Sequence, residues 1–334
     1  MATLKDVARE ARVSLSTASR AINGSKDRVV HPELQRRVTE AAQRLNYSPN
    51  AAAQAMARGH TTAVGLIVHD IRDPYFSSIA AGVTQAAARH RSVVTLATTS
   101  HEHDTEIRLI EAMRRQRVCA LVLAGGLNDD EAELAELRTT VASFKEAVGS
   151  PVAVIGQDLL DVSTVVVDNH AGARDLAQAL RGPNVTRVAI LAGPPTLFTA
   201  RDRAEGFIAG LDSTAEIAAM IHGPFDRDGG FTAMNQALAL DPRPDLVFAV
   251  NDVMAVGALV AARQAGLTVP TDIAVAGFDD IPTLHDITPA LTTARLPLEE
   301  MGEAAVRLIL ADDLIDHARV TINATVVLRE STRR

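Results

Sequence analysis

Polar side chains that can hold several hydroxyl groups follow apolar runs along the second half of the chain. Arg203 lies in LAGPPTLFTARDRAEGF, Asn251 in AVND and Asp279 in AGFDD. Aromatic rings can cover the apolar faces of a sugar while such polar groups satisfy its hydroxyls. The full candidate set, aromatic residues included, is Tyr75, Phe76, Gln157, Thr199, Arg203, Phe225, Asn251 and Asp279. These residue types predict a small-molecule site for a sugar or polyol.

A second candidate set lies near the N-terminus, around one arginine. Arg20 can donate two hydrogen bonds to guanine, Leu15 can contact a thymine methyl group, and Ser16 can donate or accept. Thr17, Ser19 and Arg28 are better placed for phosphates, which position a protein without reading sequence. Taken alone, Arg20 could equally be an ordinary surface arginine.

Three short helices are expected to position the second set. Thr3 can cap the first helix, whose apolar residues are Leu4, Val7, Ala8 and Ala11. After a turn at residues 12–13, Ser14 can cap a second helix that closes at Asn23 and Gly24. A third helix is expected in HPELQRRVTEAAQRLNY, where Pro32 suits the first turn. Two short helices joined by a tight turn are typical of a helix-turn-helix.

Short apolar runs alternate with helical periods from Thr61 onward. The runs are AVGLIV, VVTLAT, CALVLAG, PVAVIG, VVVD, RVAILAG, DLVFAV and DIAVAGF, followed by a late strand at VTINATVVL. This alternation predicts doubly wound parallel sheets covered by helices on both faces. So many strands favour two lobes, and ligands of such sheets bind beyond the carboxyl ends of strands, in the cleft between lobes.

Each candidate for the small-molecule site also has a structural alternative. Arg203 could form an ion pair that closes the lobes, and Asn251 and Asp279 could cap helices. Phe76 and Phe225 could be ordinary core residues. The residue types alone leave both interpretations open.

The sequence lacks the usual signatures of an enzyme on this fold. None of the three lysines, Lys5, Lys26 and Lys145, follows a glycine, and neither G-x-S-x-G nor G-x-G-x-x-G occurs. The loop HEHD at residues 101–104 could offer three metal ligands, but no fourth is evident and Asp104 can instead cap a helix. We therefore expect neither an enzyme nor a metal site.

Charge is divided unevenly along the 334 residues. Residues 1–60 hold 10 Lys and Arg against 5 Asp and Glu, whereas the rest hold 23 against 36. A basic head on an acidic body indicates a nucleic-acid-binding module joined to something else. The single Cys119 forms no internal disulfide, the most apolar stretch is broken at Asn251, and MATLKDVARE lacks the pattern of a leader. We expect a cytoplasmic protein that does not enter a membrane.

At this point the head resembles a known family. TLKDVAREARVSLSTASRAING, a third helix and YSPNAAAQAMARG are similar, in register, to the DNA-binding head of the LacI/GalR family of bacterial transcription regulators. The resemblance implies a hinge helix at residues 50–57 that enters the minor groove, with Asn50, Ala53 and Met56 at the DNA. Met56 stands where most members have leucine, and methionine can also act as a wedge between base steps.

The body resembles the periplasmic sugar-binding-protein fold that follows this head in the same family, through DPYFSSIAAGV, Arg203 to Phe207, AVNDVMAVG and VAGFDD. The resemblance assigns effector hydroxyls to Arg203, Asn251 and Asp279. Asp73 stands in place of the usual asparagine. The implied division is a head at 1–47, a hinge at 48–60, a first lobe at 61–157 with 297–320, and a second lobe at 158–296 with 321–334.

The resemblance implies a mechanism without a cofactor. We expect a homodimer, or a higher oligomer, that binds a pseudo-palindromic double-stranded DNA operator and is released by a sugar or polyol effector in the cleft. A regulator whose DNA binding is promoted by a nucleobase-type or protein co-repressor is the alternative.

Overall fold

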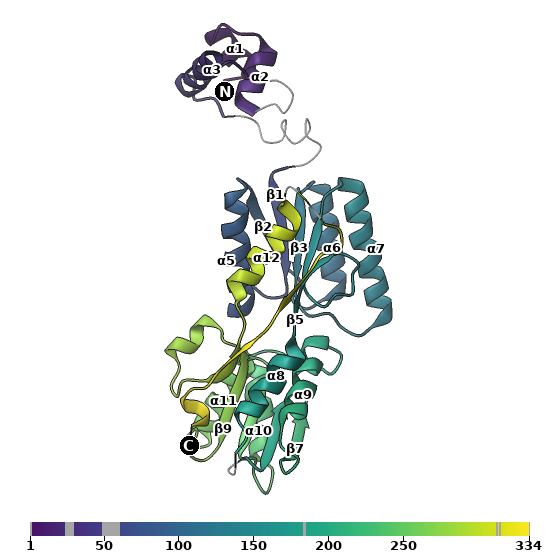
Figure 1. Cartoon of the computed structure of the whole chain (residues 1–334), viewed down its shortest axis with the longest axis vertical. Helices are drawn as coiled ribbons and strands as arrows, with labels where there is room; N and C mark the ends of the chain where they lie inside the picture. Colours follow the sequence, from purple (N-terminus) through teal and green to yellow (C-terminus); the bar gives the residue numbers. More distant parts are fainter. Residues whose placement is uncertain are drawn as a thin grey trace. The chain divides into compact units, whose positions relative to one another are not determined.

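The computed structural model describes residues 2–23, 30–48, 61–182, 185–311, 313 and 315–333. The chain divides into two compact units, Met1–Thr61 and Thr62–Arg334 (Figure 1). Across the described residues, no helix combines the length and the apolar character needed to cross a membrane.

Among its described residues, 2–23, 30–48 and 61, the first unit contains the helices α1 (Leu4–Glu10), α2 (Leu15–Asn23) and α3 (Pro32–Arg44). Thr3 caps α1 in a capping box, since its hydroxyl accepts from the Asp6 amide while the Asp6 carboxylate accepts from the Thr3 amide. Ser14 Oγ accepts from the Thr17 amide at 3.1 Å at the start of α2, and Pro32 opens α3. Both predicted caps are confirmed. A core of small and branched residues joins the helices: Val7, Ala8, Ala11, Ala18, Val38 and Ala41.

A six-stranded sheet forms the first lobe of the second unit, with strand order β11-β5-β4-β3-β1-β2 and every neighbouring pair parallel. Its strands are β1 (Ala63–Val68), β2 (Val93–Thr98), β3 (Ala120–Ala124), β4 (Val152–Gly156), β5 (Ser163–Val167) and β11 (Arg319–Ile322). Its helices are α5 (Pro74–Arg89), α6 (His103–Arg115), α7 (Glu131–Val148) and α12 (Leu298–Leu310).

A second six-stranded sheet has the order β12-β10-β9-β8-β6-β7, and only the β10–β12 pair is antiparallel. Its strands are β6 (Arg187–Leu191), β7 (Glu216–Ile221), β8 (Leu246–Ala249), β9 (Ala274–Asp279), β10 (Thr292–Arg295) and β12 (Thr325–Val327). The helices of this lobe are α8 (Asn169–Ala179), α9 (Phe198–Gly210), α10 (Arg227–Leu238) and α11 (Asp252–Gln264), with the short helices η1 (Pro282–Asp286) and η2 (Glu330–Thr332).

The chain passes between the two sheets three times, after β5, after β10 and after β11. The sequence-based boundary at residue 157 is wrong, because β5 pairs with β4 and completes the first sheet. The late strand at VTINATVVL is also corrected: it is two strands in different sheets, and the boundary at residue 320 falls inside β11.

Close helix contacts hold α12 in the first lobe although it follows the second sheet in sequence. Figure 1 shows the yellow-green α12 beside the blue α5. A Cβ on Gly82 of α5 would overlap the Glu299 carbonyl, and one on Gly302 of α12 would overlap the Ile79 carbonyl. Only glycine at these two positions lets the two backbones approach so closely.

The sequence analysis also missed the short strand β10, the edge strand β7 and the helix α10. β7 is an edge strand with mostly part-exposed residues, so its EIAAMI run lacks the fully apolar character of a central strand. α10 contains Gly229 and Gly230, which are unfavourable in a helix, yet a Cβ on Gly230 would overlap the Met254 carbonyl of α11. The suggestion that Asp104 caps a helix is also wrong, because α6 begins at His103 with Glu102 as its N-cap residue.

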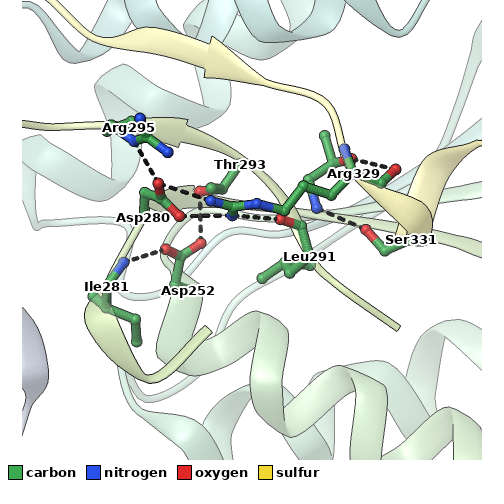
Figure 2. A network of polar contacts seen from close by, with 9 residues as sticks. Asp252, Asp280, Ile281, Leu291, Thr293, Arg295, Arg329 and Ser331 are labelled. Carbon is green, nitrogen blue, oxygen red and sulfur yellow. Dashed lines mark hydrogen bonds and ion pairs between the residues drawn. The ribbon is translucent and has the colours of Figure 1, made fainter. Parts of the chain in front are cut away.

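A network of buried and partly buried polar contacts fixes the C-terminal segment to the second sheet (Figure 2). Asp280, directly after β9, receives hydrogen bonds from Arg329 at 2.6 and 3.0 Å and from Arg295 at 2.6 Å. Asp252 accepts from the Thr293 hydroxyl at 2.7 Å and from the Ile281 amide at 3.1 Å. The network joins β9, β10, α11 and the last residues of the chain at a point where the chain crosses between lobes.

Candidate functional site

The helix α2 presents the predicted DNA-reading residues on its exposed side. Leu15 is 45% exposed, so its side chain is accessible for a contact with DNA. Arg20 folds back along its own helix, since its Nε donates to the Ser16 carbonyl at 3.0 Å and its Nη2 contacts Ser16 Oγ at 3.2 Å. Thr17 Oγ1 lies 2.8 Å from Ser14 Oγ at the cap, and Ser19 is partly buried.

The loop and hinge candidates cannot be placed in the same way. Arg28, Asn50, Ala53 and Met56 lie outside the described residues. Their assignment to DNA remains a prediction from the sequence.

The cleft between the two sheets gathers seven of the eight predicted effector residues around one small cavity of about 40 Å³. It is lined by His69, Asp73, Tyr75, Phe76, His101, Gly126, Leu197, Thr199, Arg203, Phe225, Asn251 and Asp279. An adjoining cavity of about 460 Å³ shares five of these residues, among them His69, His101 and Phe225. Both lobes contribute to each cavity, as expected for a ligand site at the carboxyl ends of parallel strands.

Arg203 is the best-fixed side chain in the cavity. Its Nε donates to Asn169 Oδ1 at 2.8 Å, its Nη1 donates to the Val250 carbonyl at 2.9 Å, and its guanidinium lies 4.0 Å from the centre of the Phe278 ring. Its Nη2 forms an ion pair with Asp279 Oδ1 at 2.8 Å. Because α9 and β9 both belong to the second lobe, this pair does not close the lobes.

Asp279 has no role as a helix cap. It is 4% exposed, and its φ of 127° lies in the region that favours glycine. Burial, partly offset by the Arg203 charge, raises the pKa of the Asp279 carboxyl to about 8. The contact with Arg203 lacks hydrogen-bond geometry, so Asp279 Oδ1 is the one buried side-chain polar atom among the described residues without a hydrogen-bond partner. A strained, buried and unsatisfied carboxyl is typical of a ligand site.

Asn251, by contrast, is a helix cap as well as a cavity residue. Its Oδ1 accepts from the Met254 amide at 2.8 Å at the start of α11. Its Nδ2 lies 3.4 Å from the Phe225 carbonyl. Phe76 is buried at 6% exposure, whereas Phe225 is only partly buried.

Gln157 is the one predicted effector residue that does not line the cavity. Its Nε2 donates to Thr199 Oγ1 at 3.0 Å, and its Oε1 accepts from the Leu127 amide at 2.9 Å. It therefore joins the first lobe to the second behind the cavity wall. Nearby, the Phe198 amide donates to the Leu127 carbonyl at 3.0 Å, so the lobes also meet through their backbones.

Two histidines in the cavity wall escaped the sequence analysis. His69 follows β1 directly, and its ring stacks on His101 with 4.4 Å between ring centres. Its Nε2 lies 3.1 Å from the Gly126 carbonyl and its Nδ1 lies 2.9 Å from Thr99 Oγ1. Because a carbonyl only accepts, we assign the hydrogen to Nε2. The sequence did contain one indication of this role, because His69 is the first residue after the carboxyl end of the apolar strand β1.

The HEHD loop does not bring its side chains together. His101 lies against His69, while His103 Nε2 contacts Glu136 Oε2 at 3.0 Å. Within the part of the chain that the structure describes, no three His, Cys, Asp or Glu residues are arranged to hold a metal ion.

Comparisons with known proteins agree with both halves of this geometry. Residues 3–50 match the family model described as bacterial regulatory proteins, lacI family, and residues 177–332 match a periplasmic binding protein-like domain. The chain is 34% identical over 316 residues to the ribose operon repressor of Escherichia coli (strain K12), covering 93% of this chain and 92% of that protein. The chain belongs to the LacI family of bacterial transcription regulators.

Two solved structures of transcription regulators have a similar fold. The lac repressor dimer bound to operator and the anti-inducer ONPF is 25% identical and covers 99% of both chains, with a TM-score of 0.82. The complex of the transcriptional regulator CelR with cellobiose is 29% identical and covers 99% of this chain and all of that one, with a TM-score of 0.68. As a LacI-family member, the chain is a DNA-binding transcription regulator and not an enzyme.

Proposed function

We propose that this LacI-family regulator is a repressor that binds a pseudo-palindromic operator as a homodimer and is released by a sugar or polyol. The cavity that joins Arg203, Asn251 and Asp279 to aromatic rings between two lobes carries this proposal. The names of similar proteins support it: one is a ribose operon repressor, and another was solved with cellobiose. Its place of action is the cytoplasm, on chromosomal DNA.

On the DNA side, α2 lies in the major groove and two-fold symmetry places a second α2 one helical turn away. Leu15, Ser16 and Arg20 meet base edges there, and Arg20 must first exchange its contacts with Ser16 for contacts with a base. Thr17, Ser19 and Arg28 contact phosphates, and Asn50, Ala53 and Met56 act in the minor groove. Phosphate contacts supply much of the affinity, so binding falls steeply as salt rises.

On the ligand side, an effector that binds both walls of the cleft changes the orientation of the lobes and with it the spacing of the two hinges. Couplings of this kind amount to about 1–3 kcal/mol, or roughly 5- to 150-fold in affinity. Such a coupling requires an effector that binds one orientation of the lobes more tightly than the other.

A thermal-shift screen of sugars, polyols and nucleosides with the full chain tests the effector class, because a ligand of the folded state raises the melting temperature. Each hit is then added to the protein on an operator selected from a random DNA pool. A sugar or polyol that weakens operator binding supports the proposal. A nucleoside that strengthens it, or no hit at all, favours the co-repressor alternative.

Arg20→Ala tests base reading by α2. We expect selected operators to lose preference at one base position per half-site, at a cost of about 1–3 kcal/mol on the original site. Arg36→Ala, on the exposed side of α3, is the matched control and leaves base preference unchanged. An equal loss of affinity for all sequences would make Arg20 a phosphate contact.

A further inference from the structure

The cleft is lined by more acidic than basic side chains. Around the small cavity the carboxyls of Asp73, from the first lobe, and Asp279, from the second, face a single guanidinium, that of Arg203. His69 does not add positive charge near neutral pH, because burial lowers its pKa to about 4. The adjoining cavity adds the acidic side chains of Asp70, Glu102, Glu106, Glu133 and Asp226 and the one guanidinium of Arg72. Asp70 pairs with Arg72, and burial raises the pKa of Glu106 to about 7. Such a lining attracts cations and repels anions.

The hydrogen bonds and the ion pair made by Asp73 and Asp279 leave room for one more positively charged partner. Asp73 caps α5, and this uses Oδ1, which accepts from the Tyr75 amide at 2.9 Å. Asp279 Oδ1 is buried beside Arg203 without a hydrogen bond. Arg203 can neutralise one carboxylate but not both, and a buried carboxylate without a counter-charge is costly.

Near neutral pH a proton on Asp279 takes this role when no ligand is present, whereas Asp73 is mostly ionised. Burial raises the pKa of Asp73 to about 6 and that of Asp279 to about 8. A hydroxyl group can donate a hydrogen bond to each carboxylate but brings no charge. A protonated amine donates hydrogen bonds and also neutralises the second carboxylate.

The aromatic wall fits the same kind of group. Tyr75 and Phe76 lie edge to face with 5.0 Å between ring centres, and Phe225 lines the cavity from the other lobe. Ring faces attract ammonium groups and also cover the C–H face of a sugar ring.

We propose that the effector of this cleft is a polyhydroxyl compound that carries a protonated nitrogen, of the amino-sugar or imino-sugar class, held between Asp73 and Asp279. This rests on the proposed function in assuming that the inter-lobe cleft is the effector site. Asp73 is then the specificity residue: it selects the charged nitrogen, while Arg203 and Asn251 bind hydroxyls.

Matched ligand pairs test the proposal on the full chain by titration calorimetry at pH 7. The pairs are 1-deoxynojirimycin with 1,5-anhydro-D-glucitol, D-galactosamine with D-galactose, and D-glucosamine with D-glucose. In each pair only the first compound contains a nitrogen, and this nitrogen is its only group that can carry a positive charge. We expect the nitrogen-containing member of at least one pair to bind at least about tenfold more tightly.

Asp73→Asn removes the charge while keeping a residue that caps helices well. We expect it to lower the preference for the nitrogen-containing member about tenfold or more. Asp175→Asn, at an exposed acid on α8, is the control and keeps the preference of the unchanged chain.

Three results would overturn the proposal: equal or tighter binding of the neutral member in every pair, no binding of any nitrogen-containing member, or an unchanged preference in Asp73→Asn. Operator binding measured alongside separates this from the proposed function. Neutral sugars that bind and release operator without a preference for nitrogen refute only the present inference. Amines that bind with the expected preference but do not affect operator binding refute only release by effector.

Discussion

His69 shows how one residue of the cleft responds to its surroundings. Its ring is packed between His101 and Phe76, and both ring nitrogens have partners on neighbouring loops. Burial, followed by the charge of His101, lowers the pKa of His69 from 6.5 to about 4. The folded protein therefore keeps this imidazole neutral under conditions in which the unfolded chain protonates it.

The first prediction follows from this difference. The unfolded chain takes up a proton near pH 6.5 and the folded chain only near pH 4, so stability is lost as the pH falls through this window. The loss amounts to roughly 3 kcal/mol. Urea unfolding at pH 7 and pH 4 measures it, and His69→Gln, which does not titrate, should lose that much less than the unchanged chain. Equal losses in the two proteins would show that His69 is not held neutral.

At the scale of single residues, the sequence predicted those cavity residues that lie at or just after the carboxyl end of a strand. Asn251 and Asp279 stand at carboxyl ends of strands, and parallel sheets bring such positions to one edge. Asn169 and His101 escaped because their roles depend on contacts between distant segments, such as Asn169 with Arg203. Gln157 was expected in the cavity, but its side chain turns to Thr199 and Leu127.

At the scale of elements, the network in Figure 2 anchors the last residues of the chain to β9 and β10. The Asp280 side chain is 5% exposed and binds Arg329 through two hydrogen bonds. Although burial alone would raise its pKa, Arg329 and Arg295 hold the pKa of the Asp280 carboxyl below its usual value. The carboxylate is thus stabilised in its charged form.

We expect Asp280→Ala to destabilise the body by about 1.5–3 kcal/mol, because it leaves the partly buried Arg329 guanidinium without its carboxylate partner. Asp280→Asn, which retains one acceptor oxygen, should cost less. Asp228→Ala is the matched control: its pair with Arg227 is largely exposed, so its loss should hardly change the free energy of unfolding. Denaturant unfolding compares the three, and a similar small loss in all of them would contradict a stabilising role for the network.

The limits of prediction at this scale also have physical causes. Strands with a fully apolar run, such as β3 and β8, were recognised because both their faces are buried. The sequence could not predict which lobe contains β5, because the apolar run VVVD would suit either sheet. Helix α10 carries a glycine pair for close packing on α11, and glycine in a sequence indicates a helix end rather than a helix–helix contact.

At the scale of the whole molecule, contacts behind the cavity hold the two lobes together. Gln157 bridges Leu127 and Thr199, Arg201 pairs with Asp129 at 3.0 Å, and the Asp129 amide donates to the Thr196 carbonyl at 2.9 Å. These contacts need no ligand, so the described arrangement of the lobes has its own stabilisation.

We expect Gln157→Leu to weaken this junction and to lower the affinity for whichever sugar the thermal-shift screen identifies. The loss should be about fivefold, since a hydrogen bond of this kind contributes about 1 kcal/mol. Gln236→Leu, at an exposed position on α10, should leave the affinity unchanged. Calorimetric titration measures both. An affinity equal to that of the unchanged chain in Gln157→Leu would mean that the junction does not contribute to the ligand-binding arrangement.

The two compact units have separate hydrophobic cores, and this leads to the last prediction. Among the described residues, the head buries six apolar residues in a cluster of its own, whereas the body has two larger clusters. Domains with their own cores fold independently. A chain without residues 1–61 should therefore melt within about 2 °C of the body transition of the full chain and show the same ligand-induced shift. It should no longer bind DNA. A body that melts much lower without the head, or that loses the ligand-induced shift, would show that the head contributes to the stability of the cleft.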